Sequence, residues 1–190
     1  MQDSKLQILI VDDEPSLLTS LSNSLRELGY DVRSATNGFS ALSEMRNAVP
    51  HILISDLNMP GMSGFELLSI VRRRFPAIPV IAMSGAFPDK TMPDGVAADC
   101  FYQKGSGIYP LLTAIAKFPF DLQMNRVEAP IWVAQNGYES AGEAYITMTC
   151  PECLRTFPQM LSSSATPIGS TRCIHCGVSI PFAVTTVRRA

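Results

Sequence analysis

The stretch that decides the fold is HILISDLNMPGMSG, residues 51–64. Its first five residues form a short apolar run, which is typical of a strand buried in a parallel sheet. The run ends in a carboxylate, Asp56, and a turn that contains Pro60 and Gly64 follows directly. Packing alone does not explain a charge at the end of a buried strand. Its position raises the question of which other polar groups the fold brings to the same place.

Apolar runs alternate with helical periodicity through the first part of the chain. Strands are predicted at 6–11, 31–35, 51–55, 78–84 and 99–104, and helices from Pro15 to Leu28 and at 38–47, 63–75 and 107–118. The helix at 63–75 is predicted to be amphipathic, with basic residues at its far end. Prolines in 85–98 allow only a short or broken helix there. This order predicts an α/β, doubly wound fold with a five-stranded parallel sheet.

Parallel strands bring their carboxyl ends to one edge of the sheet, where ligands bind in this fold class. Five polar residues end a predicted strand or follow one immediately: Asp12, Asp13, Asp56, Ser84 and Lys104. Three carboxylates at one edge repel each other unless a cation lies among them, and Mg²⁺ prefers such oxygen ligands. A carboxylate beside Mg²⁺ can attack a phosphoryl group, with a lysine and a hydroxyl to stabilise the developing charge.

The motifs VDDEPS (11–16), DLNMPGMSGFELL (56–68), AMSGA (82–86) and FYQK (101–104) resemble the receiver domain of two-component response regulators. The resemblance covers residues 5–118 and implies a flavodoxin-like (CheY-like) fold. It implies that Asp56 is the phosphoacceptor. It also implies that Asp12, Asp13, Asp56 and the backbone carbonyl of Asn58 hold Mg²⁺.

The same resemblance assigns roles to three residues on later strands. It implies that Ser84 senses the phosphoryl group, that Lys104 pairs with it, and that Phe101 is the aromatic switch residue. Two features depart from the family pattern. Gly105 replaces the usual proline, which loosens the turn after the lysine. The broken helix within 85–98 belongs to the face through which family members usually dimerise, so we do not expect that mode of dimerisation here.

Each of these residues also has a purely structural explanation. Asp13 could cap the helix that begins near Pro15. Lys104 could be solvated surface, Ser84 a turn residue and Phe101 part of the core. A degenerate receiver that is never phosphorylated is therefore the alternative to phosphoryl chemistry. An enzyme such as a phosphatase is not expected, because Asn58 stands where an aspartate would suit that reaction and no general acid follows Asp56.

Four of the five cysteines form two pairs, CPEC (Cys150, Cys153) and CIHC (Cys173, Cys176), with nineteen residues between them. This spacing predicts a structural zinc site with four thiolate ligands and no open coordination position. A redox pair and an iron centre are the less favoured alternatives. His175 is predicted to be exposed, and Cys100 to be a buried core thiol.

The segments around the cysteine pairs are similar to zinc-ribbon modules, in which Phe157 and a residue near Ile180 flank the knuckles. The predicted organisation is a receiver domain at 1–118, a linker at 119–130 and a small β-rich zinc-ribbon module at 131–190. Two strands around NGYESAG (136–142) could form a β-hairpin, and 179–189 could form another strand. So small a module could not fold on apolar burial alone, so zinc would supply its folding energy.

Composition limits the remaining classes of function. The 190 residues are 46% hydrophobic with a net charge of −2, which argues against a broadly basic nucleic-acid-coating protein. No apolar run has the length of a membrane span, and the N-terminus lacks the features of a signal peptide, so a cytoplasmic protein is expected.

These observations predict a response regulator that receives a phosphoryl group from a sensor histidine kinase or a phosphotransfer protein. The zinc ribbon would pass the signal to a partner protein. Nucleic-acid binding through the ribbon is the alternative; Arg172, Arg188 and Arg189 offer some positive charge for it, but few aromatic residues are placed for base stacking.

Overall fold

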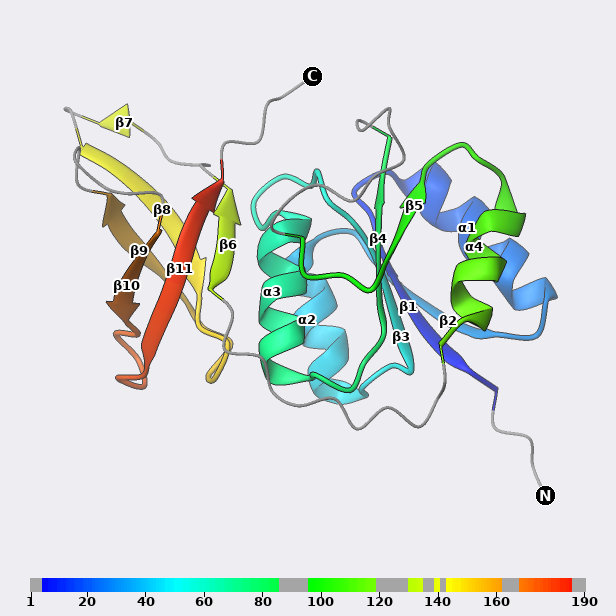
Figure 1. Cartoon of the computed structure of the whole chain (residues 1–190), viewed down its shortest axis with the longest axis horizontal. Coiled ribbons are helices and arrows are strands. Elements are labelled where there is room, and N and C mark those ends of the chain that lie inside the picture. The colour runs from blue at the N-terminus through cyan, green and yellow to red at the C-terminus, as the bar shows by residue number, and fades with distance from the viewer. Residues whose placement is uncertain are drawn as a thin grey trace.

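A computed structural model of the chain describes residues 5–85, 96–118, 130–134, 139–140, 143–161 and 168–185. Its first part is one parallel sheet with the strand order β2-β1-β3-β4-β5 (Figure 1). The strands are β1 (Gln7–Val11), β2 (Asp31–Ala35), β3 (Ile52–Asp56), β4 (Val80–Ser84) and β5 (Cys100–Gln103). This strand order is that of the flavodoxin-like doubly wound fold, so the predicted fold class of this part is confirmed.

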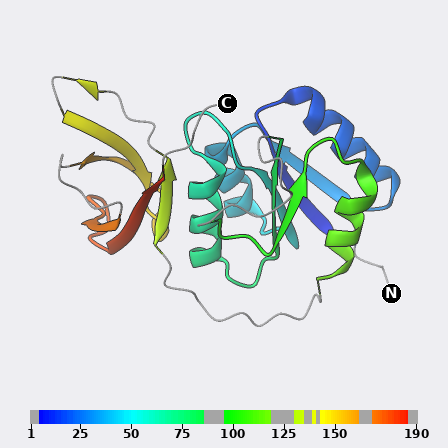
Figure 2. The same cartoon turned by 45° about the horizontal axis from the view of Figure 1, so that its top comes forward.

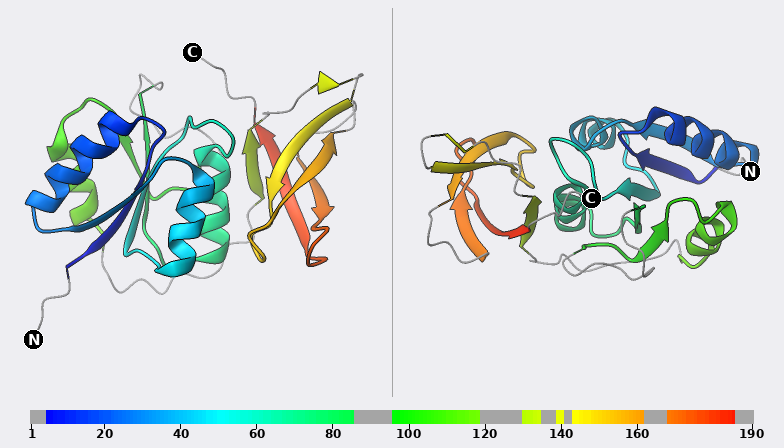
Figure 3. Two further views of the ribbon diagram at one scale, coloured as in Figure 1. Left: turned by 180° about the vertical axis from the view of Figure 1, so that it is seen from behind. Right: turned by 90° about the horizontal axis from the view of Figure 1, so that it is seen from above.

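In the described residues, four helices cover the sheet, two on each face. They are α1 (Pro15–Glu27), α2 (Gly38–Asn47), α3 (Gly64–Arg74) and α4 (Ile108–Ala116). The helices α1 and α4 lie on one face, and α2 and α3 lie on the other (Figures 1 and 3). The short helix predicted within 85–98 falls almost entirely outside the described residues, because residues 86–95 are not among them.

Each helix begins and ends where the local chemistry favours it. Asn37 caps α2 by accepting a hydrogen bond from the backbone of Ser40, and Ser63 caps α3 in the same way from Glu66. Pro15 stands at the start of α1, where a missing N–H costs nothing. Gly29, with φ +94°, ends that helix as predicted.

The C-terminal part of the described chain is all β and forms two small sheets. Its strands are β6 (Ile131–Ala134), β7 (Glu139–Ser140), β8 (Glu143–Thr149), β9 (Thr156–Leu161), β10 (Ile168–Arg172) and β11 (Ser179–Thr185). One sheet has the order β10-β11-β6 and the other β7-β8-β9. The strand predicted at 179–189 is therefore present over Ser179–Thr185, and the rest of its range lies outside the described residues.

The hairpin predicted around residues 136–142 is only partly correct. Strand β8 does form an antiparallel pair with the two-residue β7. Strand β6, however, pairs in parallel with β11 and belongs to the other sheet. Its partner residues lie about fifty positions later in the chain, and the local turn residues carry no information about such a pairing.

The C-terminal sheets pack directly on α3, the helix that follows the strand ending in Asp56 (Figures 1 and 2). The amphipathic helix with basic residues at its far end is present, but every residue from Gly64 to Arg72 is buried, and the polar side of α3 faces the C-terminal sheets. One continuous apolar cluster runs from the parallel sheet through α3 into the C-terminal sheets. It includes Leu53, Leu68 and Ile70 from the first part and Ile131, Ile146, Phe157 and Ile180 from the second.

Polar contacts also join α3 to the C-terminal sheets. The backbone N–H of Trp132 donates to Ser69 Oγ at 3.2 Å, and that of Thr149 donates to Glu66 Oε1 at 2.9 Å. An ion pair of 3.9 Å joins Arg74 to Glu152. Both Ser69 and Glu66 are buried, so the C-terminal sheets supply the donors that water would otherwise provide.

The domain boundaries stay a prediction, because residues 119–129 of the expected linker lie outside the described residues. None of the helices in the described part of the chain combines the length and the apolar character needed to cross a bilayer.

Candidate functional site: an acidic edge and a four-cysteine cluster

The carboxyl end of the parallel sheet gathers the residues that the strand order predicts. Asp12 follows β1, Asp56 ends β3, Ser84 ends β4 and Lys104 follows β5. Carboxylate oxygens of Asp12, Asp13 and Asp56 all lie within 4.8 Å of one another. The backbone N–H of Lys104 donates to the Ser84 carbonyl at 3.0 Å, which ties the lysine to the end of β4. We call this set of five residues the acidic edge.

Lys104 lies between the two buried carboxylates of the acidic edge. Its Nζ is 2.7 Å from Asp12 Oδ2 and 3.2 Å from Asp56 Oδ1. Burial alone would lower the pKa of Lys104, but hydrogen bonds to Asp12 and the charges of Asp56 and Asp12 raise it instead. The lysine therefore stays charged and neutralises part of the negative charge at this edge.

Asp56 is held in an environment that disfavours its charged form. Burial raises its pKa to about 6; Lys104 lowers it and the neighbouring Asp12 raises it further. A carboxylate that is desolvated yet close to a cation is a reactive oxygen nucleophile, because little water has to leave before it attacks. Asp56 thus has the environment expected of an acceptor and not that of a surface charge.

The loop between β3 and α3 is fixed by backbone hydrogen bonds. The N–H of Leu57 donates to the Met83 carbonyl and that of Gly64 donates to the Leu57 carbonyl, both at 3.0 Å. A Cβ on Gly64 would overlap the carbonyl oxygen of Asp56 and lie 2.6 Å from Leu57 Cα. Gly64 is therefore needed for the close approach of α3 to the strand that carries Asp56.

Replacing Gly64 with alanine should destabilise the protein by about 1–3 kcal/mol, since backbone must move to admit the methyl group. Urea unfolding of the two chains would measure the difference. Ser40→Ala is the control, because it changes a capping residue of α2 without crowding Asp56. Gly29→Ala would be a poor control, because the positive φ of Gly29 strains any residue with a side chain. Equal stability of the Gly64 variant and the parent chain would contradict this account of the loop.

The remaining residues predicted for the acidic edge have different surroundings. Asn58 lies in the loop after Asp56 and is exposed, while Phe101 is half-buried on β5 and packs against the core. Asp13 is exposed and does not cap α1, because the capping position is Glu14. Asp12 Oδ1 instead accepts the backbone N–H of Glu14 at 2.9 Å. The capping explanation of Asp13 is therefore wrong.

A pocket opens beside Lys104, between α1 and the turn that follows β5. Its lining includes Glu14, Leu17, Tyr102, Lys104 and Ile108. Tyr102 is buried and its hydroxyl donates to the Gly107 carbonyl at 3.1 Å, which fixes the turn. Of the acidic edge, Lys104 lines this pocket and the three carboxylates do not, so the pocket lies beside the carboxylate cluster.

The donor set of the acidic edge fits Mg²⁺. Three carboxylates meet within the reach of one small cation, and two of them, Asp12 and Asp56, are almost completely buried. One lysine cannot balance three carboxylates, so a divalent ion would relieve the remaining repulsion.

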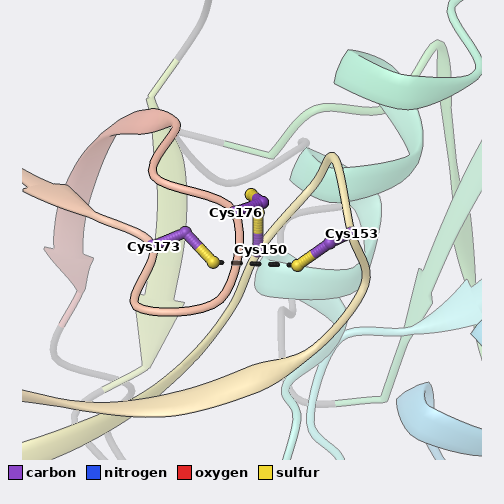
Figure 4. A group of neighbouring side chains, drawn as sticks. All are labelled: Cys150, Cys153, Cys173 and Cys176. Carbon is purple, nitrogen blue, oxygen red and sulfur yellow. Dashed lines mark hydrogen bonds between the residues drawn. The ribbon is translucent and has the colours of Figure 1, made fainter.

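The four paired cysteines converge although they come from two different sheets (Figure 4). Cys150 Sγ lies 3.6 Å from Cys176 Sγ, and Cys153 Sγ lies 3.7 Å from Cys173 Sγ. A disulfide needs about 2.05 Å between sulfurs, so these thiols are free. A tetrahedron with zinc–sulfur bonds of about 2.3 Å has edges of about 3.8 Å, which the observed separations approach.

Each cysteine pair lies on a turn of the same construction. The N–H of Cys150 donates to the Arg155 carbonyl and that of Leu154 to the Cys150 carbonyl. In the second turn, Cys173 and Gly177 repeat these two bonds, with Val178 in the place of Arg155. Leu154 and Gly177 both have positive φ, 55° and 74°. Two matched turns are what two zinc knuckles require, although sequence reasoning assigned this role only to Gly177.

The electrostatics differ between the thiols of the cluster: burial raises the pKa of Cys150 to about 12, whereas the pKa of Cys173 is lowered to about 6. Burial would raise the pKa of Cys173, but backbone N–H groups of His175 and Cys176 point at its sulfur and lower the pKa. Such N–H donors stabilise thiolates, which are the form that binds zinc. His175 is exposed as predicted, and its Nε2 lies 3.1 Å from the Thr156 carbonyl.

Cys100 is a correction to the predicted set. It is half-buried at the edge strand β5, and not a fully buried core thiol. The misassignment arose because β5 is the last strand of the sheet and has a neighbour on one side only.

Sequence reasoning missed the residues that connect the two sites. Glu66, Ser69 and Thr149 were not singled out from the sequence. One signal was available: the apolar residues of α3 occupy more than half of the circumference of the helix, a wider stripe than a single buried face needs.

The fold and the acidic edge define a class, the flavodoxin-like α/β proteins with a carboxylate site at the sheet edge. The family model of the response regulator receiver domain matches residues 8–103. The chain belongs to this family of two-component signalling domains. The match ends before the C-terminal sheets begin.

Known relatives support the family assignment. Two chemotaxis response regulator structures of CheY4 from Vibrio cholerae are 29% and 30% identical, with a TM-score of 0.55, and cover 60% of this chain and 98% of theirs. The response regulator TrrA from Thermotoga maritima, in complex with Mg²⁺ and BeF, is 30% identical with a TM-score of 0.55 and covers 59% of this chain and 97% of its own.

Longer relatives share only the receiver part. Sensor protein EvgS from Escherichia coli is 43% identical over 76 residues, which are 40% of this chain and 6% of that protein. The probable transcriptional regulatory protein TcrX from Mycobacterium tuberculosis is 35% identical over 77 residues, 40% of this chain and 33% of its own. The chain therefore matches a third or less of the length of these two relatives.

Proposed function

We propose that the protein is a phosphorylation-controlled response regulator whose output element is the C-terminal module. Asp56 accepts the phosphoryl group, and the donor is a phosphohistidine on a sensor kinase or a phosphotransfer protein. One observation carries the proposal: Asp56 is buried, close to Lys104, and joined by Asp12 and Asp13 in one carboxylate cluster.

Each residue of the acidic edge has its own role in this phosphoryl transfer. The Asp56 carboxylate attacks phosphorus, the nitrogen–phosphorus bond of the donor breaks, and the imidazole leaves with a proton from solvent. Lys104, already within hydrogen-bond distance of Asp56, pairs with the phosphoryl oxygens. Ser84 and Phe101 sense the group, and the Asn58 carbonyl completes the ligand set with Asp12, Asp13 and Asp56. Bound Mg²⁺ would supply positive charge at the same oxygens.

The four-cysteine cluster acts as a structural zinc site in this proposal. Its sulfurs converge to tetrahedral separations, and the set leaves no position open for a substrate. Zinc would hold the two C-terminal sheets together, because the paired cysteines come from turns that leave different sheets. The module then presents a fixed surface to a partner protein.

Nucleic-acid binding by the module is less well supported. Among its described residues, the basic side chains Arg155 and Arg172 are partly offset by Glu152. Arg188 and Arg189 lie outside the described residues. A phosphate-binding surface needs several clustered cations, so a protein partner is favoured.

Beryllofluoride with Mg²⁺ tests the acceptor site, because it occupies the position of a phosphoryl group on a carboxylate. We expect it to raise the melting temperature of the parent chain by several degrees and to leave Asp56→Asn unchanged. Glu27→Gln, which removes an exposed carboxyl from α1, is the control and should respond like the parent chain. Equal responses of the Asp56 variant and the parent chain would identify a degenerate receiver.

A further inference from the structure

Helix α3 is in contact with both candidate sites. Its first residue, Gly64, packs on the Asp56 carbonyl, and its outer side carries the C-terminal sheets (Figure 3). In the described part of the chain, α3 is the helix with the most extensive burial, from Gly64 through Arg72. A displacement of the loop that holds Asp56 therefore cannot be absorbed by solvent-exposed side chains on this helix.

Glu66 is the polar link at the start of α3. Its backbone N–H donates to Ser63 Oγ at 3.3 Å, and its carboxyl oxygen accepts the N–H of Thr149 at 2.9 Å. The side chain is almost completely buried, at 2% exposure. An apolar residue would cover the same surface at lower cost, because burying a carboxyl requires desolvation. The specific bond to Thr149 is what the carboxyl adds.

The bond to Thr149 reaches the first cysteine turn directly. Thr149 is the last residue of β8, and Cys150 follows it and begins the turn that carries Cys153. The chain of contacts from acceptor to cysteine thus runs through Asp56, Gly64, Glu66, Thr149 and Cys150. Every link in it is a covalent segment, a tight backbone contact or a hydrogen bond within the described residues.

We propose that Glu66 is a positioning residue that couples the loop of Asp56 to the turn of Cys150 and Cys153. Phosphorylation of Asp56 then changes how tightly the four-cysteine site holds zinc, and zinc loading changes the phosphorylated state in return. This inference rests on the proposed function and names the contacts through which the C-terminal module responds to phosphorylation of Asp56. Coupling of this kind is reciprocal by thermodynamic necessity.

The physical basis of the coupling is a shift of the loop between β3 and α3 against the buried helix α3. A phosphoryl group adds charge and volume at Asp56 beside Lys104, and the loop must accommodate both. Gly64 and Ser63 transmit that movement to the first turn of α3, which bears Glu66. The Thr149 N–H either follows the carboxyl or loses its buried partner. Both responses alter the geometry of the neighbouring cysteine turn.

Zinc release from the full chain tests the coupling. The zinc-loaded protein is treated with acetyl phosphate and Mg²⁺, a colorimetric chelator is added, and the release rate is compared with that of the untreated protein. Intact mass of the same samples records the phosphoryl group. We expect phosphorylation to change the release rate of the parent chain by about fivefold or more.

Three variants separate positioning from simple packing. Glu66→Ala should lose the dependence of zinc release on phosphorylation, and Glu66→Gln, which keeps an oxygen acceptor for Thr149, should retain it. Ser69→Ala is the matched control: it lies on the same helix and loses a bond to the same module, but at Trp132 and not at the cysteine turn. It should retain the full dependence.

The outcomes are distinguishable. Phosphoryl uptake with an unchanged release rate in the parent chain overturns the coupling and leaves the proposed function intact. An unaltered dependence in Glu66→Ala, or an equal loss in Ser69→Ala, overturns the role of Glu66. Absence of phosphoryl uptake contradicts the proposed function itself and removes the basis of the coupling.

Discussion

Replacing Cys150 with serine should empty the four-cysteine site and unfold the C-terminal sheets. Structural zinc in small modules contributes about 10–16 kcal/mol of apparent binding free energy, so the loss of a ligand removes a large part of what stabilises these two short sheets. Cys150 is also fully buried against the apolar cluster that joins α3 to the sheets, so its loss acts on both the metal and the packing.

The single tryptophan of the chain reports this unfolding. Trp132 is half-buried on β6, where its backbone bonds to Ser69 of α3. We expect its emission to move to longer wavelength in Cys150→Ser, and in the parent chain after treatment with a strong chelator. Elemental analysis should find one zinc per parent chain and none in the variant.

Cys100→Ser is the control, because Cys100 lies outside the cluster on β5. It should keep both its zinc and its tryptophan emission. A Cys150 variant that stays folded in the C-terminal part without metal would refute the zinc ribbon. Retention of zinc by Cys150→Ser would likewise show that the cluster is not the binding site.

Replacing Glu66 with glutamine should make the protein more stable at alkaline pH than the parent chain. Burial raises the pKa of Glu66 to about 8, against about 4.5 for a free glutamate; the Thr149 N–H lowers it in part. The folded state therefore binds a proton that the unfolded state releases, and stability falls as pH rises between these two values. Glutamine keeps the shape and removes the titration.

The size of this effect follows from the pKa difference. Between pH 6 and pH 9 the parent chain should lose about 2–3 kcal/mol relative to Glu66→Gln. Urea unfolding of both chains, zinc-loaded, measures the loss. Asp56 titrates in both chains, so its contribution cancels when their free energies of unfolding are subtracted. Parallel pH profiles of the two chains would show that Glu66 is not buried as described.

The parallel sheet could be predicted because its signal is local. The strands at 6–11 and 51–55 are short apolar runs, and the rule for parallel strands then places Asp12, Asp56 and Lys104 at one edge. The predicted bounds differ from the observed ones by one or two residues, as strand and helix ends commonly do.

The C-terminal arrangement could be predicted only in part. The spacing of Cys150, Cys153, Cys173 and Cys176 indicates a shared site, because only that pattern lets two tight turns meet. The pairing of β6 with β11 depends on tertiary packing against α3, which no local pattern records.

The role of α3 shows why the burial of its polar side was not predicted. Glu66 and Ser69 look like solvent-facing residues, since buried carboxyls are rare. Their partners, Thr149 and Trp132, lie more than sixty residues away in sequence. Apolar residues occupy more than half of the circumference of α3, which indicates extensive burial, but no local pattern shows that the polar side with Glu66 and Ser69 is buried as well.

The central claim is that Asp56 takes up a phosphoryl group at the acidic edge. Its most direct test is the intact mass of the zinc-loaded full chain after incubation with acetyl phosphate and Mg²⁺. The account predicts a gain of one phosphoryl group in the parent chain, located on Asp56 by fragmentation, and no gain in Asp56→Asn. An unmodified parent chain, or a phosphoryl group on another residue, would contradict it.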